Sequence, residues 1–260
     1  MASLRADAIR AHRSGSGPAA VLLHCLGVDR HLWDFTVARL ASRFTLLTYD
    51  FPGHGEAAIP TGPYRIEDLS AQLETLLARE SIERAHVIGI SLGGLVAQHF
   101  AATAPRCVER LVLVDTTPSY TDEMRRLWAQ RAAAARANGT AALLEDILKI
   151  WFTDEFVAED PPAVRYVRAA FARTSGEGYA RACEALAAAD LRPLAPRIAA
   201  TTLVLCGDRD IPSFIDAAQW LATNIRTARL DWLAPARHAS VLERPDAFVH
   251  LVAGFLAEHP

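Results

Sequence analysis

The sequence has few cysteines, and none of them forms a recognisable metal or disulfide pattern. There is no Cys-x-x-Cys pair and no histidine at zinc-finger spacing. The four residues are Cys25, Cys107, Cys183 and Cys206. This scatter predicts free thiols in a reducing cytoplasm, without a metal site, and no other motif indicates a cofactor.

Basic stripes and long apolar runs are also missing. The formal net charge is -3 over 260 residues, with charges of both signs spread along the chain. Nucleic-acid binding needs a concentrated positive surface, so nucleic acid is not an expected partner. No apolar stretch is long enough for a secretory signal or a bilayer span, which predicts a cytoplasmic protein without a membrane partner. The oligomeric state stays open.

The apolar runs that are present are short and end at Gly, Pro or Asp, as is typical of buried parallel strands. We expect strands over Ala20–His24, Phe44–Tyr49, Ala85–Ile90, Leu111–Val114, Thr202–Cys206 and Ala228–Leu233. Helical periodicity fills the segments between them, at Arg30–Ala41, Ile66–Glu80, Leu92–Thr103, Ile215–Asn224 and Pro245–Ala257. This alternation predicts an α/β fold with a mostly parallel, doubly wound sheet. Ser3–His12 adds one or two edge strands.

One long segment breaks the alternation. Between residues 117 and 194 the sequence is rich in Ala, Leu, Arg and Glu and contains no buried-strand run. Turn signals at Asn138 and Asp160 divide it into helices. We expect a helical lid over the carboxyl edge of the sheet, inserted into a core formed by residues 1–116 and 195–260.

The strongest motif is Gly-Ile-Ser-Leu-Gly at residues 89–93, between an expected strand and an expected helix. In that context GxSxG is typical of a nucleophile elbow, which presents Ser91 on a strained turn. The alternative is a Gly-rich turn in which Ser91 only caps the helix.

A serine nucleophile needs a base and an acid that orients the base. In this kind of fold they follow the serine in the order acid, then His. His238 satisfies that order in a loop after the last expected strand. Asp208 and Asp210 both follow an earlier strand, and we favour Asp210 because Asp208 is better placed to close the turn. The three side chains are then expected at one edge of the sheet.

Backbone N–H groups near the serine are expected to stabilise an oxyanion. One is the N–H of Leu92, at the start of the helix after Ser91. The second is expected from the loop after the first strand, at Leu26 or else Cys25. We interpret His24 as a structural hydrogen-bonding residue of this loop, and the side chain of Cys25 as a small pocket-lining group.

Several motifs resemble the α/β-hydrolase superfamily and, within it, the 3-oxoadipate enol-lactonase group, over nearly the whole chain. They are LLHCLGVDRHLWD, YDFPGHGE, GPYRIEDLS, IERAHVIGISLGGLVAQ, WFTDEF, GYARACEALAAADLR and LVLCGDRD. The resemblance implies an α/β-hydrolase fold and hydrolysis of an enol-lactone that carries a free carboxylate. One departure is Arg237, which stands before His238 where a Gly is usual.

A carboxylate-bearing substrate needs a cation in the lid. We expect Arg125 and Arg126, near Trp128, to bind it, with Trp151 of WFTDEF also in the pocket. The alternative is that both arginines only solvate an exposed helix face.

Two other functions stay open. A small-molecule carboxylesterase or a cofactor-free perhydrolase would use the same three residues. A non-catalytic ligand-binding protein of the same fold is disfavoured, because binding alone does not require Ser91, Asp210 and His238 together.

Overall fold

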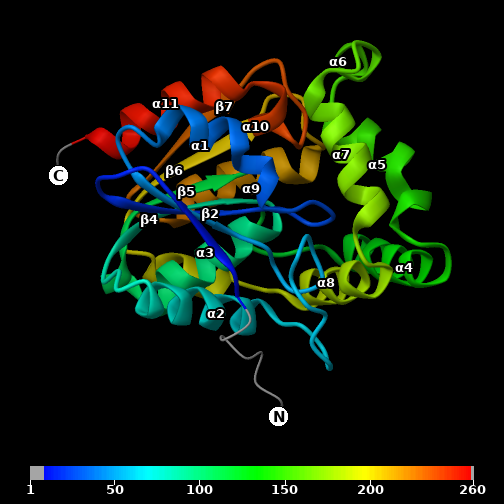
Figure 1. Cartoon of the computed structure of the whole chain (residues 1–260), viewed down its shortest axis with the longest axis horizontal. Coiled ribbons are helices and arrows are strands. Elements are labelled where there is room, and N and C mark those ends of the chain that lie inside the picture. The colour runs from blue at the N-terminus through cyan, green and yellow to red at the C-terminus, as the bar shows by residue number, and fades with distance from the viewer. Residues whose placement is uncertain (1–8, 259–260) are drawn as a thin grey trace.

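The core of the protein is one seven-stranded sheet. The computed structural model describes residues 9–258, and the strands lie in the order β1-β3-β2-β4-β5-β6-β7 (Figure 1). Only the β1–β3 pair is antiparallel, and all the other pairs are parallel. The strands are β1 (Ala11–Ser14), β2 (Ala19–Leu23), β3 (Thr45–Tyr49), β4 (Ala85–Ile90), β5 (Val108–Val114), β6 (Thr201–Gly207) and β7 (Ala228–Leu233).

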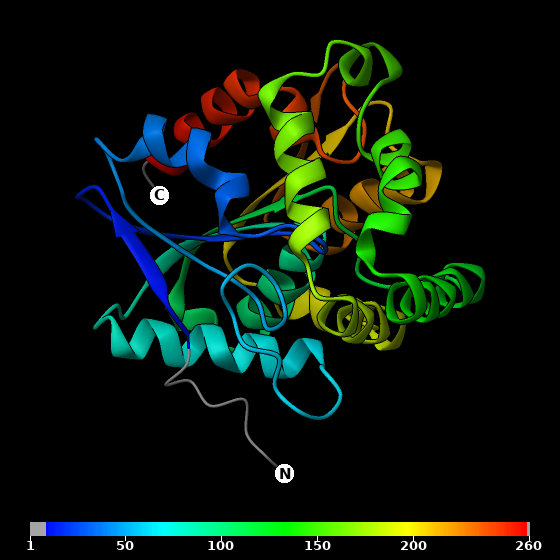
Figure 2. The same ribbon diagram turned by 45° about the vertical axis from the view of Figure 1, so that its right-hand side comes forward.

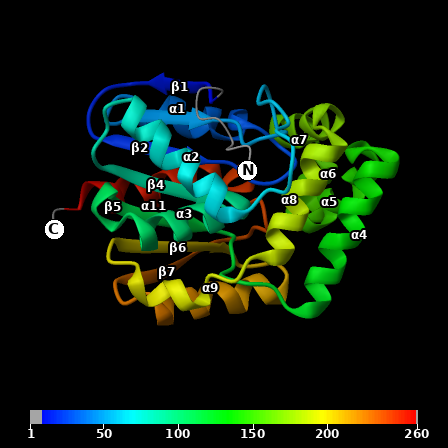
Figure 3. The same cartoon turned by 90° about the horizontal axis from the view of Figure 1, so that it is seen from below.

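Helices cover both faces of the sheet, so the central strands are buried on both sides. One face carries α1 (Asp34–Leu40) and α11 (Pro245–Ala257), and the other carries α2 (Ile66–Arg79), α3 (Leu92–Thr103) and α9 (Pro212–Asn224) (Figures 1 and 3). The short helix α10 (Ser240–Glu243) precedes α11. The expected α/β-hydrolase fold with a mostly parallel sheet is confirmed.

The six expected buried strands are all present, with ends that differ by at most three residues. The expected helix Arg30–Ala41 is divided into a 3-10 turn, η2 (Arg30–Trp33), and α1. The side chain of Asp29 accepts a hydrogen bond from the His31 N–H and so caps this turn. One edge strand, β1, is present, and residues 3–8 of the expected edge region lie outside the described residues.

The segment between β5 and β6 is helical, as expected, and its helices gather at one end of the molecule (Figure 2). They are α4 (Asp122–Asn138), α5 (Leu144–Trp151), α6 (Asp154–Ala158), α7 (Pro162–Arg173) and α8 (Gly176–Ala188), with 3-10 turns η4 (Thr140–Leu143) and η5 (Arg192–Arg197), while η3 (Pro105–Cys107) precedes β5. Both turn signals mark breaks: α4 ends at Asn138, and Asp160 has a positive φ between α6 and α7.

The parallel arrangement decides where functional side chains lie. Because the carboxyl ends of parallel strands meet at one edge, the loops after β2, β4, β5, β6 and β7 all open toward the helices α4–α8 (Figure 1). Within residues 9–258, no helix combines the length and the apolar character needed to cross a bilayer.

Candidate active site

Ser91 lies on a strained turn between β4 and α3. Its φ of 52° and ψ of -112° are unusual for a residue with a side chain. The turn is tight because the neighbouring backbones nearly touch: a Cβ on Gly93 would lie 2.3 Å from the carbonyl oxygen of Leu23. A side chain there would push the elbow away from β2. The glycine is therefore needed for the geometry that exposes Ser91 at the end of the sheet.

The structure brings Ser91, His238 and Asp210 together. His238 Nδ1 donates to Asp210 Oδ2 at 2.8 Å, because a carboxylate oxygen can only accept. This leaves the lone pair of His238 Nε2 facing the Ser91 hydroxyl, 3.2 Å from its oxygen. Asp208 lies elsewhere and accepts from the Ala236 N–H at 2.9 Å. The two aspartates therefore divide as the sequence predicts, with Asp208 closing the turn.

The environment of His238 favours its charged form. Burial alone would lower its pKa, but the charge and the hydrogen bond of Asp210 outweigh burial and raise it. The ring of Phe214 lies against the imidazole, with ring centroids 4.3 Å apart, and shields it from water. An imidazolium formed by proton transfer from Ser91 would thus be stabilised where it forms.

Asp115, which the sequence analysis did not single out, connects the loops that carry this arrangement. It follows β5 and is buried, with one carboxylate oxygen accepting from the Gly207 N–H at 2.9 Å. The other accepts from the Ser240 N–H at 3.1 Å and the Ser240 hydroxyl at 2.5 Å. Burial and the nearby Asp210 charge raise the pKa of Asp115 to about 7. The sequence feature that could have identified Asp115 as part of the site is its position directly after a buried strand.

Asp115, Cys206 and Asp210 form the one group of potential metal ligands within the part of the chain that the structure describes, with donor atoms within 4.8 Å of one another. The carboxylates do not fit a metal, since their oxygens already accept hydrogen bonds from backbone N–H groups, Ser240 and His238. Burial also raises the pKa of the Cys206 thiol, which opposes the thiolate that a metal needs.

The two residues expected to supply the oxyanion-stabilising N–H groups both lie near Ser91. Leu92 is the first residue of α3, where helix geometry provides no intrahelical acceptor for its N–H. Leu26 lies in the loop after β2 and lines the same pocket as Ser91.

His24 shapes that loop, as predicted. Its Nδ1–H donates to the Cys25 carbonyl at 2.8 Å, and its Nε2 accepts from the Phe51 N–H at 2.9 Å. Burial lowers the pKa of His24, so the ring is neutral. The prediction that Cys25 lines the pocket is wrong, because its side chain is buried and is not part of the wall of the cavity beside Ser91.

Beside Ser91 and His238 a cavity of about 150 Å³ opens under the helices α4, α5 and α8. Its wall is mostly apolar and is formed by Leu26, Met124, Leu127, Trp128, Arg131, Ile147, Ile150, Trp151, Tyr179, Ile211 and Phe214, with Ser91 and His238. Trp128 and Trp151 therefore lie where the sequence predicts them. The Nε1–H of Trp128 is buried without a hydrogen-bond partner among residues 9–258.

The prediction that Arg125 and Arg126 lie in the substrate pocket is wrong, because helix geometry turns both side chains away from the cavity. Arg125 donates to the carbonyls of Tyr120, Ala187 and Ala189, and Arg126 is exposed. The helix α4 instead presents Met124, Leu127, Trp128 and Arg131, spaced i, i+3, i+4 and i+7.

Arg131 is the one arginine of the cavity wall, and it stacks on Trp128 with its guanidinium carbon 5.0 Å from the ring centroid. It forms no ion pair with any other described residue. Because Trp128 and Arg131 are three residues apart on one helix, helical periodicity could have predicted that they lie on the same face.

Comparison with known proteins places this geometry in a family context. A family model described as the alpha/beta hydrolase family matches residues 20–251. The chain is 33% identical to 3-oxoadipate enol-lactonase 2 of Acinetobacter baylyi over 235 residues, which cover 90% of this chain and 87% of the relative. It is 34% identical over 253 residues to the pimeloyl-[acyl-carrier protein] methyl ester esterase of Chromobacterium violaceum, covering 94% of this chain and 95% of the relative.

Among solved structures, the crystal structure of the enol-lactonase from Burkholderia xenovorans LB400 superimposes with a TM-score of 0.92. It is 37% identical, and the match covers 96% of both chains.

Proposed function

Because the chain belongs to the alpha/beta hydrolase family, we propose that it is a serine hydrolase that cleaves a carboxylic ester or lactone through an acyl-enzyme on Ser91. The observation that carries this proposal is the continuous chain of contacts from the Ser91 hydroxyl through His238 to Asp210. A serine hydroxyl is a weak nucleophile at neutral pH, and this contact chain supplies the base and the group that orients it.

The reaction follows from these contacts. Ser91 Oγ attacks the carbonyl carbon while its proton passes to His238 Nε2, and the N–H groups of Leu92 and Leu26 stabilise the oxyanion. Collapse of the tetrahedral intermediate transfers that proton to the leaving oxygen and leaves an acyl group on Ser91. A water molecule then attacks the acyl carbon while its proton passes to His238, and His238 returns this proton to Ser91 Oγ as the acid leaves.

We further propose that the substrate is an enol-lactone of the 3-oxoadipate enol-lactone type. The names of the lactonase relatives support this choice. Arg131 supports it chemically, since a guanidinium in an otherwise apolar cavity favours a small substrate with one carboxylate.

A simple carboxylic ester is the second candidate. The largely apolar wall and the methyl ester esterase relative favour it.

For either substrate, we propose that residues 117–194 act as a cap on the core of residues 1–116 and 195–260. The cytoplasmic location stays a prediction.

Hydrolysis assays with 3-oxoadipate enol-lactone and with p-nitrophenyl acetate test this function. We expect Ser91→Ala to lower kcat by at least about 10⁴-fold. A phosphonate that reacts with serine should label the wild type at Ser91 and leave the variant unlabelled. Full turnover by Ser91→Ala would overturn the proposal, and a strong preference for the aryl ester would favour the second candidate.

The variant Arg131→Met tests whether Arg131 binds a carboxylate of the substrate. Loss of one charged hydrogen-bonding partner should raise KM for the lactone by about 10-fold to 100-fold. The KM for neutral p-nitrophenyl acetate should change little. Arg126→Met, on an exposed face of the same helix, is the matched control. An equal effect of Arg131→Met on both substrates would contradict an ionic role.

A further inference from the structure

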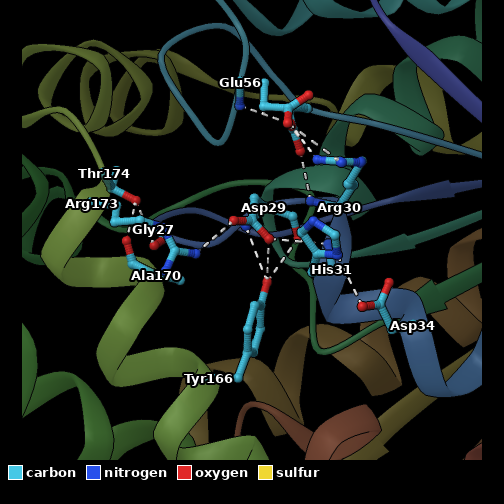
Figure 4. Close-up of polar contacts among 11 residues, drawn as sticks. Gly27, Asp29, Arg30, His31, Asp34, Glu56, Tyr166, Ala170, Arg173 and Thr174 are labelled. Atoms are coloured by element: carbon cyan, nitrogen blue, oxygen red, sulfur yellow. Dashed lines mark hydrogen bonds and ion pairs between the residues drawn. The ribbon is translucent and has the colours of Figure 1, made fainter.

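The loop that follows β2 is held from above by a helix of the cap. Figure 4 shows Gly27 and Asp29 of this loop facing Tyr166, Ala170, Arg173 and Thr174, which belong to α7 and its C-terminal end. The contacting residues are between 137 and 147 positions apart in the chain. Helix α7 has no residue in the cavity wall, so its contact with the loop is separate from substrate contact.

The first attachment joins Tyr166 to Asp29. The Tyr166 hydroxyl lies 2.8 Å from Asp29 Oδ1 and 3.0 Å from the Asp29 carbonyl oxygen, and it also accepts from the Asp29 N–H at 3.3 Å (Figure 4). Arg173 adds an ion pair to Asp29 Oδ2 at 3.3 Å.

The environment keeps this pair in its hydrogen-bonding form. Burial alone would raise the pKa of Asp29, but hydrogen bonds from Tyr166 and the His31 N–H outweigh it and lower the pKa. Burial and the Asp29 charge raise the pKa of Tyr166. A protonated phenol therefore faces a buried carboxylate, the charge-assisted kind of hydrogen bond, which is the stronger kind.

The second attachment joins Thr174 to Gly27. The Thr174 hydroxyl lies 3.0 Å from the Gly27 carbonyl oxygen and 2.9 Å from the Ala170 carbonyl oxygen, so its one proton is shared between the loop and α7 (Figure 4). Gly27 has a φ of +85°, and a Cβ built on it would lie 2.4 Å from the ring of Phe171. The ring of Phe171, a residue of α7, thus packs directly on the backbone of Gly27, which follows Leu26.

We propose that α7 is a positioning element of the oxyanion hole, in which Tyr166 and Thr174, acting through Asp29 and Gly27, fix the N–H of Leu26 where the oxyanion forms. This inference rests on the proposed function, because only an oxyanion gives the position of that N–H a catalytic meaning. His24 supports the same loop from below. The donor is therefore held between the core and the cap.

The geometry explains why two attachments matter. Oxyanion stabilisation depends on donors that need no reorganisation during the reaction, and displacement by about 1 Å is costly. Leu26 lies between supports on both sides: His24 and Cys25 precede it, and Gly27 and Asp29 follow it. When the support from α7 is lost, the loop after Cys25 keeps the turn capped by Asp29 and the bond from the Arg30 N–H to Asp50 Oδ1 at 2.7 Å, both of which lie on the far side of Gly27 from Leu26.

Tyr166→Phe tests the inference in the full-length protein with p-nitrophenyl acetate. Removing one oxyanion donor costs about 10² to 10³ in kcat, so a displaced donor should cost about 10-fold, with KM within about twofold. Affinity for phenylboronic acid, which forms a tetrahedral adduct on serine, should fall by a similar factor.

The matched control is Tyr49→Phe, which removes a buried hydroxyl without a hydrogen-bond partner among the described residues. Its kcat should equal that of the wild type. Thr174 gives a second, independent pair of variants: Thr174→Val should lower kcat and boronate affinity, and Thr174→Ser should restore both, because serine keeps the hydroxyl. This pair keeps the test valid if Tyr166→Phe does not fold.

Two results would overturn the inference in different ways. In the first case the wild type is active, and the correctly folded variants Tyr166→Phe and Thr174→Val keep its kcat and its boronate affinity. Helix α7 then does not position the oxyanion hole, even if the thermal stability of the variants falls. If the wild type neither hydrolyses an ester or lactone nor binds the boronate, the proposed function fails, and the inference fails with it.

Discussion

Histidines in this protein differ in charge state because their surroundings differ. His24 and His54 are buried without a close carboxylate partner for the ring, and burial lowers both pKa values, that of His54 to about 3. His238 is equally buried, but Asp210 raises its pKa above the ordinary 6.5. Of these three, only His238 has an environment that brings its titration toward neutral pH and above.

The pH profile of activity should report His238. The base must be neutral to accept the Ser91 proton, so kcat/KM should rise with pH, with a midpoint above 6.5. Rates of phosphonate labelling at Ser91 should follow the same curve. A profile that is flat between about pH 5 and 9, or a midpoint below 6.5, would contradict the role of Asp210 as the partner that raises this pKa.

At the scale of elements, the cap is also attached to the loop that carries His238. The Arg237 side chain donates to the carbonyls of Lys149 at 2.6 Å and Phe152 at 3.0 Å and pairs with Asp154 at 3.0 Å. The backbone adds the bond from the Ala239 N–H to the Trp151 carbonyl at 2.9 Å. Arg237 thus joins the end of α5 to the loop that carries His238.

Arg237→Met should lower the free energy of unfolding by about 1 to 2 kcal/mol, mainly through the two carbonyl bonds. The pair with Asp154 contributes little, because that carboxylate is exposed. Urea unfolding measures the change. Arg192→Met is the control, since within residues 9–258 the Arg192 side chain pairs only with Asp190, two residues away. An equal loss in both variants would show that the carbonyl bonds add nothing.

At the scale of the whole molecule, three helices of the cap each contact the core at a different place. Helix α7 holds the loop at Gly27–Asp29, the end of α5 holds the loop at His238, and Gly178 of α8 packs against Gly53, where an added Cβ would lie 2.5 Å from the Gly53 carbonyl oxygen. Contacts of this kind couple the stability of one part to that of the other.

We therefore expect cap and core to unfold together. Scanning calorimetry should show a single transition, with the calorimetric and van't Hoff enthalpies in agreement. A phosphonate on Ser91, surrounded by residues of both parts, should raise the midpoint without splitting the transition. Two separate transitions in the unlabelled protein would contradict this coupling.

Features that depend on short stretches of chain were predictable from sequence. Six buried strands follow from apolar runs, and the elbow at Ser91 follows from glycines that local sterics require. The approach of His238 and Asp210 to Ser91 follows from a topological rule, since all three come after parallel strands.

The tertiary structure decided which side chains of the cap meet the core. The sequence reveals the periodicity of α4 but not its rotation, so Arg131 enters the cavity while Arg125 and Arg126 do not. Asp115 and the contacts of α7 with Gly27 and Asp29 depend on residues more than 90 positions apart in the chain. Such contacts are fixed by packing of whole elements, and no local preference of the chain encodes them.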